Sequence, residues 1–177
     1  MKRTTLARLH VHRLPGDRRR GRLVAGTLIV PCALGRGGPT HQKREGDGGT
    51  PVGRFRLLGV SFRPDRMPRP RTLLALKAIR PDDGWCDDPR DRRYNRPIRV
   101  PDKAGHERMW RDDGLYDVVV DIAWNRGPIR RGRGSAIFLH LAKGGFGPTE
   151  GCIALSRPAL RRLLTQLGPR TRIEIVG

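Results

Sequence analysis

A histidine and a cysteine near the end of the chain are the residues with the most distinctive potential chemistry. Residues 135–156 read SAIFLHLAKGGFGPTEGCIALS, so His140 ends an apolar run and Cys152 follows a glycine-rich stretch. A thiol becomes a nucleophile when an imidazole takes its proton or holds it as the thiolate. Backbone N–H groups must also face the developing oxyanion. Gly151, directly before Cys152, suits such a turn because a side chain there would restrict the backbone.

The same two residues also have a purely structural interpretation. A lone cysteine before Ile-Ala-Leu behaves as a small buried hydrophobic residue in many proteins. A histidine at the end of a strand can equally serve packing alone. The residues by themselves therefore leave both a cysteine–histidine nucleophile and a buried, inert thiol open.

The apolar pattern predicts several strands that would position these residues. Runs rich in β-branched and aromatic residues, bounded by Gly, Pro or Asp, indicate strands. They cover residues 23–34, 54–62, 72–79, 115–124, 135–142 and 171–176. We expect 23–34 to be one buried strand, because both alternating sets of its residues are mostly apolar. Residues 35–53 are glycine-rich and predict a loop, and the prolines of 81–113 predict irregular structure.

One helix is predicted after the cysteine. Ser156 suits the N-cap and Pro158 the first turn. Leu160, Leu163, Leu164 and Leu167 then repeat at helical spacing, and Gly168-Pro169 ends the pattern. The chain therefore predicts a β-rich α+β fold, with residues 1–15 as a basic tail and 16–177 as one domain.

The charge of the chain favours anionic partners. Its 37 Lys and Arg residues against 17 Asp and Glu leave a formal charge of +20, which attracts nucleic acid, anionic lipid or carboxylate-rich polymers. Aromatic residues make up only 5%, too few to favour base stacking, and no nucleic-acid-binding motif is present. No apolar run is long enough for a membrane-spanning helix. Cys32, Cys86 and Cys152 fit neither a disulfide framework nor a zinc site.

Segment 140–155 resembles the signature of the L,D-transpeptidase catalytic domain, or YkuD-like, family. That signature is a His, a variable stretch, then Ser or Thr, one residue, Gly and Cys, matched here by His140 and Thr149-Glu150-Gly151-Cys152. Further stretches similar to a compact single-domain branch lie upstream. They are Pro31–Arg36, Lys43–Gly48, Thr50–Gly53, Gly84–Asp88 and Tyr94-Asn95. The resemblance implies a mixed β-sheet sandwich or partial barrel with one main helix after the cysteine.

The resemblance also implies roles for individual residues. Cys152 matches the nucleophile and His140 the histidine that activates it, oriented in many members by a backbone carbonyl. Gly151 and its neighbours match the oxyanion-hole turn, and Thr149 matches the Ser/Thr position. Glu150 stands where many members have His, and a carboxylate there would raise the pKa of the thiol unless an Arg offsets it. Thr149 and Glu150 are therefore expected to line the substrate site.

A second departure concerns recognition of the substrate carboxylate. Members often place Arg two residues after the cysteine, where this chain has Ala154. Arg133 and Arg157 are then the candidates for a bidentate clamp, although each also reads as an ordinary surface charge.

The function implied by the resemblance is peptidoglycan L,D-transpeptidation. Cys152 would be acylated by a stem tetrapeptide with release of D-Ala, and an amine of a second stem would complete a 3→3 cross-link. Water as acceptor would give an L,D-carboxypeptidase instead, and a basic nucleic-acid or anionic-polymer binding module with a relict site is the alternative class. No metal or organic cofactor is expected, and the protein is expected to be a monomer whose partners are peptidoglycan stem peptides. The family implies the periplasm or cell envelope, although residues 18–34 make an imperfect export signal.

Other polar features of the sequence favour structural roles. His106-Glu107 has the residue types of an acid–base pair but lacks a recognised motif around it. The aspartates of 82–91 do not follow calcium-loop spacing, and the three tryptophans favour packing over sugar binding. Around residues 45–53, a structural role is favoured over contact with substrate.

Overall fold

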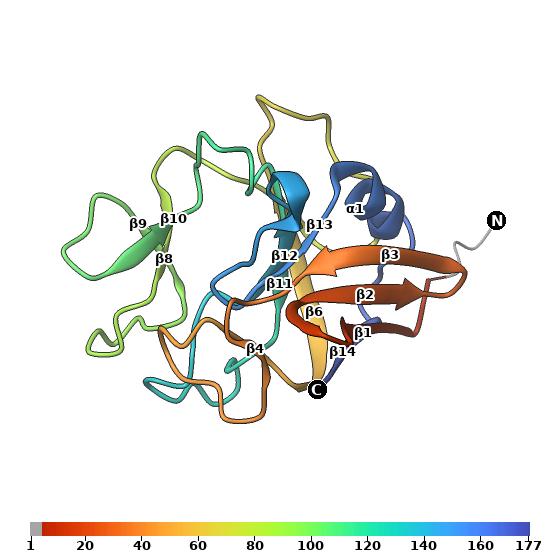
Figure 1. Cartoon of the computed structure of the whole chain (residues 1–177). Helices are drawn as coiled ribbons and strands as arrows, with labels where there is room; N and C mark the ends of the chain where they lie inside the picture. Colours follow the sequence, from red (N-terminus) through yellow and green to blue (C-terminus); the bar gives the residue numbers. More distant parts are fainter. Residues whose placement is uncertain (1–4) are drawn as a thin grey trace.

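The computed structural model describes residues 5–177 and consists mainly of strands (Figure 1). The largest sheet has the strand order β11-β12-β13-β3-β2-β1-β14-β6-β7, and pairing of β11 with β6 closes it into a barrel. Its strands are β1 Arg8–Leu14, β2 Asp17–Ala25, β3 Leu28–Ala33, β6 Gly53–Phe62, β7 Leu76–Ala78, β11 Val118–Ile122, β12 Phe138–Leu141, β13 Ile153–Leu155 and β14 Arg172–Val176. The β-rich α+β expectation is confirmed, and the partial barrel is a closed one.

The prediction that residues 1–15 form a basic tail outside the domain is wrong for the residues that the structure describes. Strand β1 pairs in parallel with β14 and antiparallel with β2, and Leu9 and Val11 are fully buried. The alternation of apolar and polar side chains in 8–12 fits a strand with one face on the core. The described part of the expected tail, residues 5–15, is thus largely an integral barrel strand, and residues 1–4 lie outside the described residues.

The predicted single strand over 23–34 is a hairpin instead. Strands β2 and β3 pair from Arg20–Ala33 to Ala25–Leu28 around a turn that contains Gly26. Gly26 has φ +61°, a conformation that glycine adopts without strain. The turn was not predicted because Gly26-Thr27 interrupts the apolar run by only two residues. Two residues is the commonest loop length in hairpins.

The helix follows the prediction closely. Helix α1, Arg157–Leu164, begins after the N-cap Ser156, whose hydroxyl accepts a hydrogen bond from Ala159 N. Leu160, Leu163 and Leu164 are buried against the barrel interior. The helix ends three residues earlier than the leucine pattern, yet Leu167 still packs in the core.

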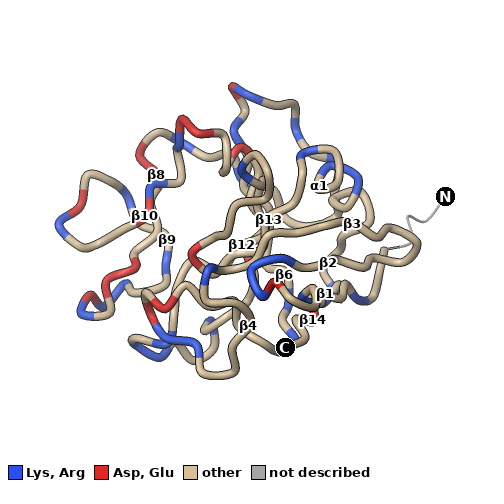
Figure 2. Tube along the Cα trace, viewed as in Figure 1, with Lys and Arg blue, Asp and Glu red and all other residues tan. Residues whose placement is uncertain are grey.

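The middle of the chain is more regular than its prolines predicted. Strands β8 Asp83–Cys86, β9 Pro97–Arg99 and β10 His106–Arg108 form a separate small sheet beside the barrel (Figure 1). Aspartates of this lobe pair with arginines, as Asp91 and Asp102 do with Arg93 at 2.7 Å. Asp91 and Asp102 are thus ion-paired rather than merely solvated. Figure 2 shows acidic residues gathered in this region, whereas β1 and β2 carry mainly cations and β3 carries no charge.

A second hydrophobic cluster joins the lobe to the barrel. It contains Trp85 from β8, Met109 after β10, Val119 from β11 and Phe138 from β12, with Cys152 among them. The Trp85 and Phe138 rings meet edge to face at 5.0 Å. Cys152 therefore lies where the two sheets pack together, and Trp85 serves packing as expected.

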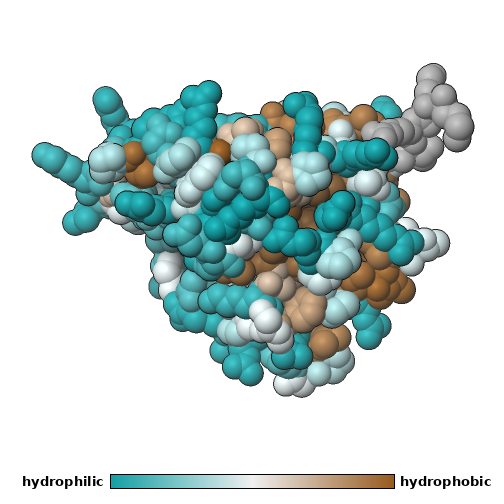
Figure 3. Space-filling model, turned by 90° about the horizontal axis from the view of Figure 1, so that it is seen from above, coloured by the Kyte–Doolittle hydropathy of each residue, from teal (hydrophilic) through white to brown (hydrophobic). Residues whose placement is uncertain are grey.

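The rest of the structure adds short elements around these sheets. Strands β4 Gly38–Thr40 and β5 Gly49–Pro51 pair within the predicted loop, and a 3-10 turn η1 covers Gly144–Phe146. Within residues 5–177, no helix has the length and apolar character needed to cross a membrane. Figure 3 shows hydrophilic side chains over most of one face, with apolar residues visible between them.

Candidate active site

His140 lies on barrel strand β12 and is almost fully buried. Its Nδ1 is 2.8 Å from the carbonyl oxygen of Leu141. Since a carbonyl can only accept, Nδ1 must carry the proton, and Nε2 is left as the basic nitrogen. Burial lowers the pKa of His140 to about 4, so the imidazole is neutral at pH 7.

Cys152 follows a tight turn built by Thr149 and Gly151. Thr149 Oγ1 donates to the carbonyl of Cys152 at 2.6 Å and accepts from Gly151 N at 3.2 Å. Gly151 has φ +131°, and a Cβ there would lie 2.7 Å from Gly49 O. Only glycine fits this position, and Thr149 shapes the turn rather than simply lining a pocket.

Parallel pairing of β12 with β13 brings the histidine and cysteine segments together. His140 is the register partner of Ala154, two residues after Cys152. Strand β13 Ile153–Leu155 lay outside the predicted strands, because three apolar residues are too short a run to distinguish from the start of a helix.

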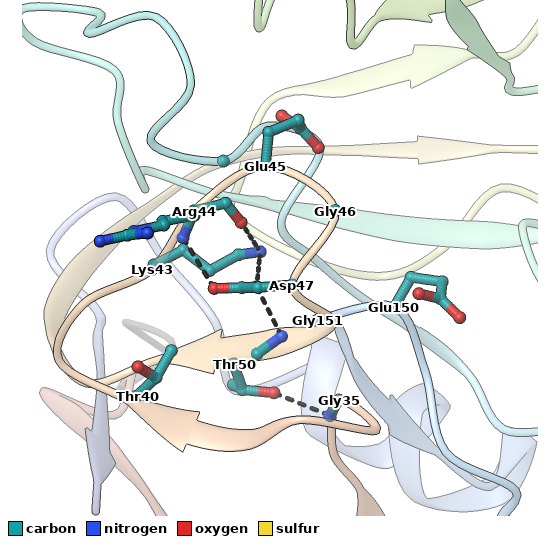
Figure 4. Close-up of polar contacts among 12 residues, drawn as sticks. Gly35, Thr40, Lys43, Arg44, Glu45, Gly46, Asp47, Thr50, Glu150 and Gly151 are labelled. Atoms are coloured by element: carbon teal, nitrogen blue, oxygen red, sulfur yellow. Dashed lines mark hydrogen bonds and ion pairs between the residues drawn. The ribbon is translucent and has the colours of Figure 1, made fainter.

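Segment 34–53 packs against the cysteine turn, and Figure 4 shows several of its residues together with Glu150 and Gly151. Thr149 N donates to Leu34 O at 2.9 Å, and Arg36 N donates to Thr149 O at 2.8 Å. Lys43, 2% exposed, pairs with Asp47 at 2.5 Å, and Asp47 also accepts from Gly49 N. The contacts of Asp47 and Gly49 agree with the structural role favoured for residues 45–53.

The sulfur of Cys152 is held between two backbone groups of residues 136–138, at the start of β12. The thiol donates to Ala136 O at 3.1 Å, and the sulfur accepts from Phe138 N at 3.3 Å. Burial is the main cause that raises the pKa of Cys152 to about 12, and the carboxylate of Glu107 adds to it. In the resting state the pair is thus a neutral thiol and a neutral imidazole.

Both side chains line one cavity of about 140 Å³, which we call the Cys152 cavity. Its other lining includes residues 147–150 and several polar side chains. Those discussed below are Glu107, Arg111, Tyr116 and Lys143. The ring of Tyr116 meets that of His140 edge to face at 5.2 Å. The buried cysteine is thus reachable from a hollow that the histidine shares.

Glu150 lines this cavity, and an arginine offsets its charge. Arg36 Nε is 2.8 Å from Glu150 Oε2, and Glu150 is largely exposed. The carboxylate that raises the pKa of Cys152 is Glu107. The increase in the thiol pKa that was expected from Glu150 therefore comes from Glu107 on β10.

The two arginines expected to clamp a substrate carboxylate lie elsewhere, which corrects that expectation for this cavity. Arg157 pairs with Asp117 at 2.5 Å and lines a different hollow beside residues 66–71. Arg133 is exposed, and its carbonyl accepts from Trp124 Nε1. The cations at the Cys152 cavity are Arg111 and Lys143.

Sequence reasoning missed Arg111, Tyr116 and Lys143 and ranked Glu107 low. Glu107 comes from β10 in the small sheet, and its Oε1 accepts from the Tyr116 hydroxyl at 2.9 Å. Tyr116, Arg111 and Glu107 are 36 to 45 positions from Cys152, and Lys143 lies beside a glycine-rich loop, so no local motif marks them. The one available signal was the adjacent polar pair His106-Glu107 in an otherwise irregular region.

The described residues offer no alternative chemistry of a comparable kind. Across residues 5–177 no cluster of three His, Cys, Asp or Glu could hold a metal ion. Cys32 and Cys86 are free and buried like Cys152. A larger cavity of about 340 Å³ is lined by Trp85, Phe138 and Arg126, and it contains neither His140 nor Cys152.

The family model described as YkuD, L,D-transpeptidase catalytic domain, matches residues 16–175. The chain belongs to this family. No curated protein matches it, and among solved structures it is similar to the crystal structure of Mycobacterium tuberculosis L,D-transpeptidase 1. That similarity has 14% identity and a TM-score of 0.41, and it covers 96% of this chain. The chain spans 62% of that protein's length.

The two motif residues, His140 and Cys152, meet at one cavity in the described chain. The carbonyl of Leu141 occupies the place of the backbone acceptor that the resemblance implied for orienting the imidazole.

Proposed function

We propose that this protein is a peptidoglycan L,D-transpeptidase in which Cys152 is the nucleophile and His140 its base. The observation that carries the proposal is the shared cavity of Cys152 and His140, with Nδ1 of the imidazole fixed on Leu141 O. Fixing Nδ1 as the donor leaves Nε2 to accept a proton, which is the role a cysteine nucleophile requires.

The first half-reaction acylates the enzyme. Sulfur attacks the carbonyl that links the diamino acid of a stem tetrapeptide to its terminal D-Ala, while His140 accepts the thiol proton. The C–N bond then breaks, the same proton passes to the departing amine, and D-Ala leaves. A thioester and a neutral imidazole remain, and backbone N–H groups at the Gly151–Cys152 turn are the proposed oxyanion donors. Because Gly151 N already donates to Thr149, Cys152 N is the principal donor in this proposal.

The neutral resting states of Cys152 and His140 determine when the thiol proton is transferred. With the pKa of Cys152 near 12 and that of His140 near 4, transfer of the proton must accompany the attack of sulfur. A substrate that fills the cavity also contributes, because its own polar groups replace the Ala136 carbonyl as partner of the sulfur.

The second half-reaction decides between transpeptidation and hydrolysis. An amine of a second stem gives a 3→3 cross-link, whereas water gives L,D-carboxypeptidase activity. The high positive charge favours encounter with anionic stem peptides in either case. Thr149 and Glu150 belong to the substrate-facing rim in this proposal, which also places the enzyme at the cell envelope and as a monomer.

Intact-protein mass spectrometry tests the acylation half. Incubation with a carbapenem or a tetrapeptide muropeptide should add one covalent adduct, absent in Cys152→Ala and at least ten-fold slower in His140→Ala. Cys32 and Cys86 are present in both variants and serve as internal controls. A wild-type protein that forms no adduct from neutral to alkaline pH contradicts the proposal.

The charge of +20 supports one alternative, a binding module for nucleic acid or another anionic polymer. Such a module would bind duplex DNA with steep salt dependence, and Cys152→Ala would bind as well as the wild type. The absence of a covalent adduct together with this binding would favour it over the enzyme.

A further inference from the structure

Glu107 presents a buried, half-satisfied carboxyl group to the Cys152 cavity. Its Oε1 accepts from Tyr116 at 2.9 Å, whereas Oε2 is buried and has no hydrogen-bond partner within the described residues. The stem of the residue is partly exposed, so it is the carboxyl end that is enclosed. A buried acceptor without a donor costs about 1–3 kcal/mol. A molecule in the cavity that brings an N–H or O–H group would remove this cost.

The position of Glu107 differs from that of the other reactive groups. Cys152 and His140 come from neighbouring barrel strands, whereas Glu107 comes from β10 of the small sheet. The carboxyl thus reaches the cavity from an element that holds neither of them. A second substrate entering between the two sheets would meet Glu107 while the barrel side holds the acyl group.

Glu107 differs in charge from the other residues that line the Cys152 cavity. Lys143 is cationic and suits carboxylates of the substrate, Arg111 is paired with Asp113, and Glu150 is exposed and paired with Arg36. Glu107 is therefore the enclosed anionic group of the Cys152 cavity, and a cation is its natural ligand. Arg111 lies over the Tyr116 ring at 5.0 Å, and no ion pair within 4.0 Å joins it to Glu107 among the described residues.

We propose that Glu107 binds the ammonium group of the acceptor stem and takes its first proton during transfer. This inference rests on the proposed function. Aliphatic amines are largely protonated at neutral pH, with pKa values of about 8 to 10, and an ammonium has no lone pair with which to attack. The carboxylate of Glu107 takes one proton and leaves a neutral amine, and Oε2 gains the donor that it lacks.

The remaining protons then balance through His140. The neutral amine attacks the thioester carbon, the new C–N bond forms and the C–S bond breaks. The second nitrogen proton passes to His140 and from there to the departing sulfur, which restores the thiol. Glu107 returns its proton to solvent when the product leaves. No other reactant is needed.

Two electrostatic features agree with a role in transfer rather than acylation. Burial raises the pKa of Glu107 to about 7, close to that of an α-amine, so proton transfer between them is nearly balanced. Glu107 also raises the pKa of Cys152 and so opposes a free thiolate. In the acyl-enzyme the sulfur belongs to a neutral thioester, so the Glu107 carboxylate faces no thiolate charge.

Single-turnover mass spectrometry tests the proposal by separating the two halves. Wild type and Glu107→Gln are acylated with a tetrapeptide muropeptide, and D-Ala release is timed. The acyl-enzymes are then chased either with a second muropeptide or with hydroxylamine, an amine already neutral at pH 7. We expect Glu107→Gln to acylate within about three-fold of wild type and to transfer to the muropeptide about 100-fold slower. Transfer to hydroxylamine should be the same for both.

Controls make each outcome decisive. Glu174→Gln, a carboxylate on β14 paired with Arg54, should leave both halves unchanged. Glu107→Asp, which only withdraws the carboxyl group, is the second variant and should slow muropeptide transfer alone. Equal loss of acylation and transfer, equal slowing with hydroxylamine, or unimpaired muropeptide transfer would each overturn the role of Glu107. Failure of wild type to acylate at all would instead overturn the proposed function itself, and the role of Glu107 with it.

Discussion

The thiol of Cys152 donates a hydrogen bond to the carbonyl oxygen of Ala136 across 3.1 Å. A carbonyl can accept only, so this contact stabilises the protonated sulfur. Together with burial it accounts for a cysteine that is unreactive until a substrate displaces the contact. Many nucleophilic cysteines have a lowered pKa, and this one has the opposite arrangement.

The alkylation rate of Cys152 should therefore keep rising with pH. The reactive species is the thiolate, and with the pKa of Cys152 near 12 its fraction grows about ten-fold per pH unit between pH 6 and 9. Iodoacetamide labelling, followed by peptide mass spectrometry at residue 152, measures it, with Cys152→Ala as the background. A rate that levels off above about pH 6 would indicate a thiolate–imidazolium pair and contradict the expectation.

Replacement of Gly151 by Ala should unfold the cysteine turn. The residue combines φ +131° with a 2.7 Å approach of a new Cβ to Gly49 O, and both costs are steric. We expect the free energy of unfolding to fall by about 3 kcal/mol and acylation to be lost. Urea denaturation checks this, with Gly144→Ala as the control, because a Cβ at 144 meets open space. Equal effects of the two variants would contradict the argument.

Glu107→Gln should stabilise the protein above neutral pH. The pKa of Glu107 rises from 4.5 to about 7 on folding, so the folded state binds more protons between these values. Stability from this group is present below about pH 4.5 and is lost as pH rises to 7, amounting to about 3 kcal/mol. The variant should therefore match wild type near pH 4.5 and exceed it at pH 8. Urea titrations at both pH values measure this, and a difference that does not depend on pH would contradict it.

Lys43→Met should destabilise the platform beneath Cys152. Lys43 is 2% exposed and pairs with Asp47, which would be left without its cation. Removing one partner of a largely buried pair costs about 3 kcal/mol, whereas an exposed pair is worth less than about 1 kcal/mol. Arg54→Ala, which breaks the exposed pair with Glu174, is the matched control for chemical denaturation. A similar small loss in both variants would show that the Lys43 pair has no special weight.

Local patterns predicted the elements whose signals are local. The N-cap Ser156 and the leucine spacing identified α1, and the predicted strands 54–62 and 135–142 correspond to β6 and β12. The N-terminal strand was missed because residues 1–15 were interpreted as a basic tail, although residues 8–12 alternate between apolar and polar side chains. The pairing with β14, about 160 residues away, leaves no trace in a short window of sequence.

The candidate site likewise contains residues that a local motif predicted and residues that only tertiary packing brings together. His140 and Cys152 were predicted from a motif, and both line one cavity, whereas Arg133 and Arg157 were predicted from residue type alone and do not line it. Glu107 and Tyr116 reach the site by packing of the small sheet on the barrel, which only the three-dimensional arrangement reveals.

Insertion of β14 between β1 and β6 has a consequence for how the chain is made. The barrel has a gap until residues 172–176 emerge from the ribosome, so β1 gains its second neighbour only after about 160 further residues have been made. During that interval β1 and β6 each expose an unpaired edge, the situation in which nascent chains depend on chaperones.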